Sequence, residues 1–233
     1  MSKRIVYETF AVVGRSPPAL HFCGFRQFHD VVGYFNGGGD VTAGPGGNIN
    51  KLDVRQITHL NYSFGLIYND EKGETNAALK DPAHLHQIWL SPKVESDLAQ
   101  IPQLRQQNPD LNVFLSVGGR GARGFSGAAA SKEARAVFIK SAQEIVDKYG
   151  LDGIDLDWEY PVNGAWGQVD SQPADRDNFT LLLKALRQAM GPQKRVTIAV
   201  GANVESPKSC WEYGADDNNQ LAKQLADSLD IKR

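Results

Sequence analysis

The sequence predicts an α/β fold made of repeated βα units around a mainly parallel sheet, and three observations point to it. Apolar segments of strand length alternate along the chain with longer segments whose apolar residues recur every three or four positions. Most of the strand segments are almost continuously apolar, as parallel strands covered on both faces are. One strand segment, within residues 151–161, instead alternates acidic and apolar residues with a period of two.

The first half of the chain is expected to hold three strands and one helix. In order, we expect an irregular lead-in over 1–30, a strand over 31–35, a glycine-rich loop to residue 50, a helical turn over 52–56, a strand over 57–67, a loop over 69–76, a helix over 91–108 and a strand over 111–117. Glycines and the Pro17-Pro18 pair make the lead-in irregular. Asn108-Pro109 ends the helix, because the residue before a proline avoids the helical region.

The second half is expected to hold two strands and three helices. In order, we expect a helix over 131–149, the acidic strand over 151–161, a helix over 175–190, a strand over 195–202 and a helix over 216–229. The first of these helices has the clearest boundaries, with Ser131 as its N-cap and Gly150 at its end. Gly191-Pro192 follows the next helix and ends it.

The order of elements fits two architectures. A doubly wound sheet would accommodate five strands, and so would part of a (β/α)8 barrel. The barrel places the acidic strand well, because its chemistry lies at the carboxyl ends of strands and Glu159 is at the end of its strand. Only about thirty residues follow the fifth strand. Three more βα units would need far more, since one βαβ unit takes roughly 30. We therefore predict an incomplete barrel of the (β/α)8 TIM type with about five βα units.

Composition excludes several classes of function. The chain has 233 residues, of which 41% are hydrophobic, so it can form one sizeable core or two small ones. A net charge of −2 gives no reason to expect nucleic acid or an anionic membrane surface as a partner. No run of 18 apolar residues is present, so we expect no membrane span.

Targeting and disulfide signals are weak. Glu8 and Arg15 interrupt the segment that follows Lys3 and Arg4, so this segment is not the apolar core of a signal peptide. We therefore expect no signal peptide. The two cysteines, Cys23 and Cys210, make no disulfide framework, although they could pair with each other.

The acidic strand carries the strongest chemical signal. Asp155, Asp157 and Glu159, here called the acid row, share one face of the strand, and the apolar residues interleaved with them share the other. Neighbouring acids on that face lie roughly 6.5–7 Å apart. At an effective dielectric constant of about 20, two such charges repel by roughly 2.4 kcal/mol. We expect at least one acid to hold its proton near neutral pH and the row to titrate as a coupled set.

Two other interpretations of this strand stay open. It could be a solvated edge strand, although its apolar face favours a strand packed on that side. It could also be a calcium loop, but such a loop needs a glycine at its sixth position and a glutamate at its twelfth.

A competing motif, G-x-G-x-x-G, spans Gly119 to Gly124 after a strand and can mark a dinucleotide site. We disfavour that site because Phe125-Ser126-Gly127 intervenes before a helix that is expected to begin near Ser131. The acids about 20 residues later fall on that helix and not at the end of a strand. His84 and His86 have no third ligand at metal spacing, so we expect neither a metal nor a cofactor.

The pattern D-x-x-D-x-D-x-E at residues 152–159 resembles the signature of glycoside hydrolase family 18, the chitinase-like enzymes, and Tyr160-Pro161 after it is also common there. Ser116-x-Gly118-Gly119 resembles the S-x-G-G motif of the same family, in the same order and at a similar distance. The resemblance looks closest to bacterial chitinases. It divides the chain into the lead-in over 1–30, a partial catalytic barrel over 31–207 and a divergent helical tail over 208–233.

The resemblance implies hydrolysis of β-1,4-linked N-acetylglucosamine polymers by a retaining, substrate-assisted mechanism. It implies that Glu159 is the general acid and later the base, and that the N-acetyl carbonyl oxygen of the substrate is the nucleophile. Asp157 would hold the acetamido N–H, Asp155 would share a proton with Asp157, and Ser116 would hydrogen-bond within this group. Asp152, on the other face of the strand, is expected to be structural.

Aromatic side chains are expected to stack on the sugar rings. Tyr34, at the end of the first strand, and Phe64, in the second, are our candidates, although a place in the core is close to equally expected for Phe64. With Tyr160 and Ser116 they complete the expected substrate-binding set. The expected partner is chitin or a chitooligosaccharide. The resemblance also implies an extracellular location, and it leaves endo and exo action open.

Three departures from the family weaken the prediction of turnover. Arg120 takes the place of the usual aromatic residue after S-x-G-G. The later Met-x-Tyr-Asp motif is absent, since the only methionines are Met1 and Met190, and the late tryptophan is absent too. An incomplete barrel would also expose strand edges, which favours self-association or a partner chain. The alternative function is a catalytically weak chitin-binding or accessory protein, or a truncated chitinase fragment.

Overall fold

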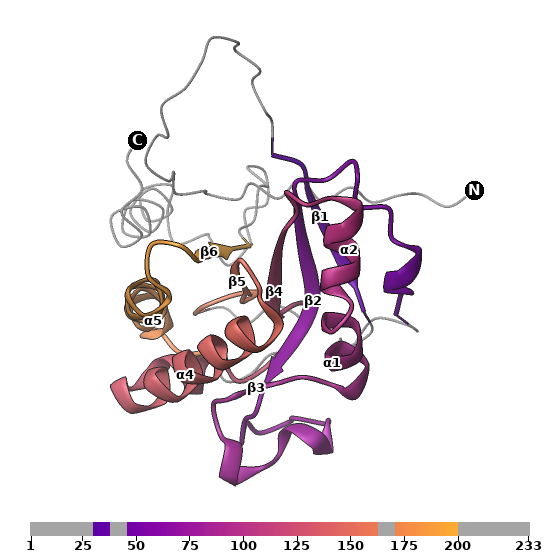
Figure 1. Ribbon diagram of the computed structural model, residues 1–233. Coiled ribbons are helices and arrows are strands. Elements are labelled where there is room, and N and C mark those ends of the chain that lie inside the picture. The colour runs from indigo at the N-terminus through magenta and orange to yellow at the C-terminus, as the bar shows by residue number, and fades with distance from the viewer. Residues whose placement is uncertain (1–29, 38–45, 163–170, 200–233) are drawn as a thin grey trace, which may run out of the picture.

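The computed structural model of the protein describes residues 30–37, 46–162 and 171–199 (Figure 1). The strands in these ranges are β1 (Val32–Asn36), β2 (His59–Ile67), β3 (Ile88–Trp89), β4 (Asn112–Gly118), β5 (Gly153–Asp157) and β6 (Arg195–Ile198). The α-helices are α1 (Pro92–Leu98), α2 (Ile101–Gln107), α3 (Phe125–Ala130), α4 (Lys132–Tyr149) and α5 (Asp175–Met190). Short 3₁₀ helices span Ile49–Lys51, Ala77–Leu79 and Pro82–His84.

The strand order separates the two predicted architectures. The parallel strands are arranged in the order β1-β2-β4-β5-β6, which follows the chain without a reversal, and β3 pairs antiparallel with the end of β2. A doubly wound sheet reverses its strand order at a switch point, whereas a barrel does not. The sheet is therefore of the predicted barrel type.

Contacts across the inner face show that the sheet curls. In the sheet, β2 and β4 lie between β1 and β5. On a flat sheet, three strand spacings would separate β1 from β5 by roughly 14 Å. The Tyr34 hydroxyl of β1 nevertheless donates a hydrogen bond to Asp155 Oδ2 of β5 at 2.9 Å. Residues on the concave face of this sheet thus meet across the interior, as they do inside a barrel.

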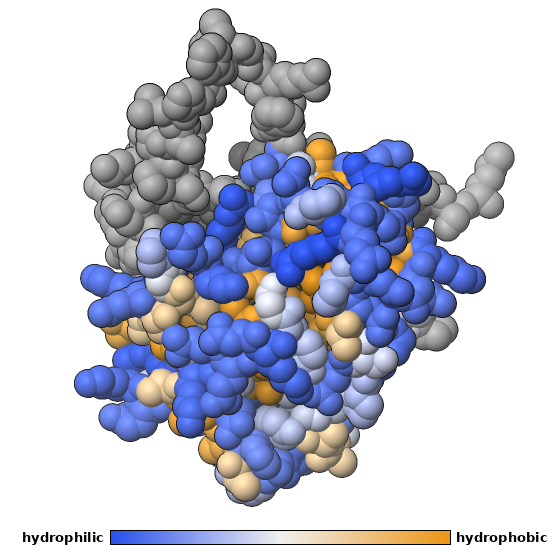
Figure 2. Space-filling model, in the orientation of Figure 1, coloured by the Kyte–Doolittle hydropathy of each residue, from blue (hydrophilic) through white to orange (hydrophobic). Residues whose placement is uncertain are grey.

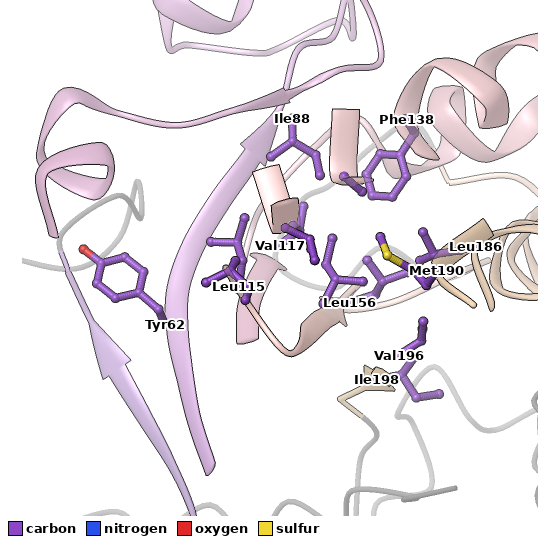
Figure 3. Packing of buried hydrophobic residues seen from close by; sticks show 14 of the residues in the cluster. Tyr62, Ile88, Leu115, Val117, Phe138, Leu156, Leu186, Met190, Val196 and Ile198 are labelled. Atoms are coloured by element: carbon purple, nitrogen blue, oxygen red, sulfur yellow. The ribbon is translucent and has the colours of Figure 1, made fainter. Parts of the chain in front are cut away.

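The hydrophobic core lies between the convex face of the sheet and the helices. Figure 1 shows α1 and α2 beside β2, and α4 and α5 beside β5 and β6. Apolar strand residues at alternate positions, among them Leu115, Val117 and Leu156, belong to one cluster with helix residues such as Leu186 and Met190 of α5 (Figure 3). Hydrophilic side chains cover most of the face in Figure 2. Among the described residues, no helix is both long enough and apolar enough to span a membrane.

Several expected elements are confirmed. The helix over 132–149 begins after Ser131, whose side chain accepts a hydrogen bond from the Ala134 N–H, and it ends at Gly150 in the left-handed conformation. The helix over 175–190 and the strands after residues 31, 57 and 111 also lie where the patterns place them.

The expected helix over 91–108 is wrong as a single element. It is divided into α1 and α2, with Ala99 and Gln100 between them. Pro102 lies in the first turn of α2 and cannot continue α1, because proline lacks an N–H and its ring clashes with the carbonyl four residues earlier. The helical turn expected over 52–56 lies instead at Ile49–Lys51, where the Asn48 side chain accepts from the Asn50 N–H.

A further helix, which was not expected, lies between the glycine-rich motif and the helix that begins after Ser131. The helix α3 begins at Phe125, directly after Gly124, so Phe125-Ser126-Gly127 does not separate the motif from a helix. This removes one argument against a dinucleotide site, but the strand order still excludes the doubly wound sheet on which that site occurs. Sequence patterns missed α3 and β3 because six-residue and two-residue elements carry too little periodicity.

Some expectations lie outside the described residues. These are the lead-in up to residue 29, the glycine-rich loop over 38–45, the strand beyond residue 199, the tail with its helix over 216–229, and both cysteines.

A neutral, buried histidine lies at the amino-terminal end of the sheet. Because Arg195 Nη1 can only donate, His59 Nε2 accepts from it at 2.6 Å, which leaves Nδ1 to donate to Thr58 Oγ1 at 2.7 Å. The imidazole also stacks on Phe114, with centroids 5.7 Å apart. Burial lowers the pKa of His59 and the Arg195 charge adds to this, although Asp30 opposes it.

We predict that this histidine makes stability depend on pH. The neutral form suits the fold, so its contribution is present above the unfolded pKa of about 6.5 and is lost as the pH falls toward the lower folded pKa. Urea unfolding should show wild type losing stability faster than His59→Gln between pH 7 and pH 5. The difference between the two proteins at pH 8 measures the packing contribution alone. Equal losses below pH 7 would contradict the prediction.

Candidate active site

The acidic strand is a central strand of the sheet. β5 pairs with β4 on one side and with β6 on the other, so the interpretation as a solvated edge strand is wrong. Asp155 is 1% exposed and Asp157 is 6% exposed, on the concave face. Ile154, Leu156 and Trp158 belong to the core on the convex face. The two faces separate as the alternation predicted.

Asp155 is bound by a residue from each of the other parallel strands. Its Oδ2 accepts from Tyr34 Oη of β1 at 2.9 Å, Asn61 Nδ2 of β2 at 3.1 Å and Ser116 Oγ of β4 at 2.8 Å. Its Oδ1 accepts from Thr197 Oγ1 of β6 at 2.7 Å. Ser116, Asp155 and Thr197 lie directly opposite one another in the sheet register. We call these five residues the Asp155 network.

Burial and hydrogen bonding act in opposite directions on this carboxyl group. Burial raises the pKa of Asp155, and the hydrogen bonds from its four donors lower it. Burial also raises the pKa of Tyr34, with further contributions from the charges of Asp155 and Asp157, so its hydroxyl keeps its proton and stays a donor. Burial thus raises the pKa of Asp155, whereas repulsion along the acid row was the cause expected from the sequence.

The S-x-G-G motif allows β4 and β5 to approach closely at their carboxyl ends. Gly118 has φ +116°, and a Cβ placed on it would lie 2.3 Å from the Asp157 carbonyl oxygen. Gly119 has φ +89°, and its N–H donates to that same carbonyl at 2.9 Å. A Cβ on Gly119 would lie 2.9 Å from the Phe64 ring. The motif therefore brings Phe64 to the end of β5 and holds the Asp157 backbone.

Glu159 lies two residues beyond the end of β5 and is partly exposed, as is Tyr160. The prediction placed Glu159 within the strand, but β5 ends at Asp157. The peptide bonds Glu159–Tyr160 and Ser63–Phe64 are both cis. Because it is partly exposed beyond the end of the strand, Glu159 lies nearer the solvent, whereas Asp155 lies deep within the sheet.

An aromatic stack holds the segment between Asp157 and Glu159. Trp158 stacks on Phe125 of α3, with centroids 5.2 Å apart, and meets Phe179 of α5 edge-on, also at 5.2 Å. This contact gives the unpredicted helix α3 a role, because it fixes the side chain that alternates with the acids.

A buried carboxylate ties the same helices together. Asp175, at the start of α5, accepts from Ser126 Oγ of α3 at 2.8 Å and from the Gln172 N–H at 2.6 Å. Burial raises the pKa of Asp175, and these hydrogen bonds oppose the effect.

The glycine-rich loop is fastened to the segment after β2. Glu71 Oε1 accepts from the Gly124 N–H at 2.8 Å, and Glu71 lies 4.0 Å from Arg123. Arg120 is exposed in this loop, directly after the Gly119 that binds the Asp157 carbonyl. A charged side chain thus stands at the position where the resemblance noted in the sequence implies an aromatic one.

The structure joins three of the seven predicted site residues by hydrogen bonds between their side chains. Tyr34, Ser116 and Asp155 are in direct contact, and Tyr34 still has 41% of its surface exposed. Sequence reasoning missed Asn61 and Thr197. A signal for both was present, because each is a polar residue within an apolar strand.

Residues outside the site also have clear roles. Asp152 Oδ2 accepts from Arg105 Nη2 at 2.6 Å and from the Val113 N–H at 2.7 Å, which are structural contacts.

His84 Nδ1 lies 2.7 Å from Asp81 Oδ2. In the part of the chain that the structure describes, no group of three His, Cys, Asp or Glu residues could hold a metal ion.

Comparison with known sequences identifies a family. A model described as "Glycosyl hydrolases family 18" matches residues 30–231. Chitinase A1 of Niallia circulans is 31% identical over 238 residues, covering 85% of this chain and 32% of the relative. Probable chitinase 2 of Drosophila melanogaster is 34% identical, covering 66% of this chain and 30% of the relative. The chain spans about a third of the length of these curated relatives.

Solved structures show the same likeness. The chitinase domain of the spore coat protein CotE from Clostridium difficile superposes with a TM-score of 0.62 at 28% identity, over 83% of this chain and 48% of that one. A family 18 N-acetylglucosaminidase from Paenibacillus barengoltzii gives a TM-score of 0.54 at 32% identity, over 71% and 42%. A class V chitinase from Nicotiana tobaccum in complex with NAG4 gives 0.52 at 25% identity, over 69% and 38%.

We predict that Gly118→Ala destabilises the protein through the site. The new Cβ would collide with the Asp157 carbonyl at a positive φ, so we expect a loss of about 3 kcal/mol or more in unfolding free energy. Gly150→Ala is the matched control, because Gly150 also has a positive φ, but the nearest atom to its Cβ is 3.8 Å away. That variant should lose only about 1 kcal/mol. Similar losses in urea unfolding would show that backbone conformation, not the close approach to Asp157, requires glycine at position 118.

Proposed function

The chain belongs to glycosyl hydrolase family 18, and on this basis we propose that it hydrolyses β-1,4-linked N-acetylglucosamine polymers such as chitin and chitooligosaccharides. The observation that carries the proposal is the acid row at the end of β5 and just beyond it, with its inner acid buried among four donors and its outer acid partly exposed. The relatives named above are chitinases, and one neighbour holds a bound NAG4.

In the proposed mechanism, Glu159 first protonates the glycosidic oxygen and then activates water. Its place beyond the end of β5 and its partial exposure support this role, because the acid must reach a bond in bound substrate. The substrate's own N-acetyl carbonyl oxygen attacks the anomeric carbon, which gives retention of configuration.

Asp157 and Asp155 are proposed to manage charge during this step. Asp157 holds the acetamido N–H and stabilises the positive intermediate. Asp155 takes up or shares the proton of Asp157, for which its raised pKa is suited. Ser116 supports Asp155 through its hydrogen bond.

Three aromatic residues are proposed to contact the sugar. Tyr34 combines an exposed ring surface with a hydroxyl on Asp155, so a sugar stacked on it would lie beside the acid row. Phe64 and Tyr160 are partly exposed, the first against Gly119 and the second directly after Glu159.

An extracellular location is proposed as well. Two similar solved structures support it. One is the chitinase domain of the spore coat protein CotE, and the other is chitinase ChiW from Paenibacillus sp., which is described as cell-surface-expressed.

A second candidate function is chitin binding with weak or no turnover, as in an accessory protein. Arg120 favours it, since a charged side chain replaces the usual aromatic residue beside the site. The retained Glu159 favours hydrolysis.

We predict that Glu159→Gln lowers the release of chromophore from an N,N′-diacetylchitobioside by at least about a hundredfold, because general acid catalysis contributes that much. Chitin binding should persist. Glu144→Gln is the control, since Glu144 is exposed on α4 and its side chain is 65% exposed. If wild type and both variants are folded and bind chitin but release nothing, the second candidate function is correct.

Self-association is a further part of the proposal. Among the described residues, no strand pairs with the outer edge of β1 or of β6, and Val31 and Val32 are exposed beside the first of these. Such edges invite pairing with another chain. Light scattering after gel filtration should give a mass of at least twice 25.5 kDa. A well-folded species of 25.5 kDa would overturn this part alone.

A further inference from the structure

The two oxygens of Asp155 are bound in different ways. Within the described ranges, three donors reach Oδ2, at 2.8, 2.9 and 3.1 Å, whereas one donor, Thr197 Oγ1, reaches Oδ1 at 2.7 Å. Both oxygens are buried with the side chain, so neither can exchange these partners for bulk water. The proton that Asp155 holds at low pH must therefore find its place among these donors.

Oδ2 is a poor place for that proton. Asn61 Nδ2 can only donate, whereas the Tyr34 and Ser116 hydroxyls can donate or, after rotation, accept. With Ser116, three donors already point to an oxygen that has two lone pairs. A proton on Oδ2 would compete with the Asn61 N–H, which cannot accept it, and would require at least one of the two hydroxyls to stop donating. Oδ1, with a single donor, is the oxygen that can carry it.

Thr197 can serve both states of the carboxyl group. Its hydroxyl donates to the ionised form, and the same hydroxyl can rotate and accept when Oδ1 is protonated. It lies opposite Asp155 in the sheet and is 8% exposed, and the branched side chain limits its rotamers. The hydrogen bond from Thr197 is one of the four that lower the pKa of Asp155.

We propose that Thr197 is a positioning residue that places the proton of Asp155 on Oδ1 and sets the pH at which Asp155 releases it. In the proposed mechanism Asp155 exchanges a proton with Asp157, so Thr197 would control the pH range of the reaction without touching substrate. The mechanistic part of the inference rests on the proposed function. The titration of Asp155 itself does not.

The test is a titration of the aspartate side chains by ¹³C NMR, with the Asp155 signal assigned from its absence in Asp155→Asn. Thr197→Val removes the donor to the ionised form and keeps the shape of the side chain. We expect it to move the Asp155 midpoint upward by about one pH unit. Thr197→Ser keeps the hydroxyl and should restore the wild-type midpoint. Ser116→Ala is the matched control, because Tyr34 and Asn61 still bind Oδ2, and its shift should be clearly smaller.

An unchanged midpoint in Thr197→Val, or equal shifts in Thr197→Val and Ser116→Ala, would overturn the inference. If Thr197→Val does not fold, Thr197→Ala is measured in its place, with the same expected direction. Where the chain turns over substrate, the pH profile of kcat/KM should move with the NMR midpoint, and a profile that does not move would overturn the mechanistic part. A chain without turnover fails the proposed function, while the titration still decides the role of Thr197.

Discussion

The burial of one carboxyl group organises this fold. Asp155 is removed from water inside a curled sheet, and a buried carboxylate is stable only where hydrogen-bond donors replace the water that it loses. Those donors come from β1, β2, β4 and β6. The strands must therefore keep both their register and their curvature, because a shift by one residue would turn the donors to the opposite face.

Other features keep the rest of the acid row in place around this carboxyl group. Gly118 and Gly119 let β4 approach the Asp157 carbonyl more closely than any side chain would permit. Trp158, on the opposite face, is held between α3 and α5. Asp157 is thus fixed through its backbone on one side and its neighbour on the other. This arrangement gives a rigid inner pair of acids and an outer acid, Glu159, that lies nearer the solvent.

The two ends of the sheet use polar residues for different purposes. At the amino end, the neutral His59 ring accepts a hydrogen bond from the Arg195 cation, which serves stability. At the carboxyl end lie the S-x-G-G motif, the end of β5 and the exposed Arg120. In barrels generally, chemistry lies at the carboxyl ends of the strands, and this is the end at which the proposed catalytic acids lie.

The sequence by itself determined the class of fold, most of the strands and helices, and the acid row, because period-two alternation and flanking caps are local signals. It also determined the family, through residues 152–159 and Ser116-x-Gly118-Gly119. Only the tertiary structure decided the break between α1 and α2, the helix α3, and the parts played by Asn61 and Thr197. Both of these residues lie far along the chain from Asp155, and only the curvature of the sheet and its register bring them to its two oxygens.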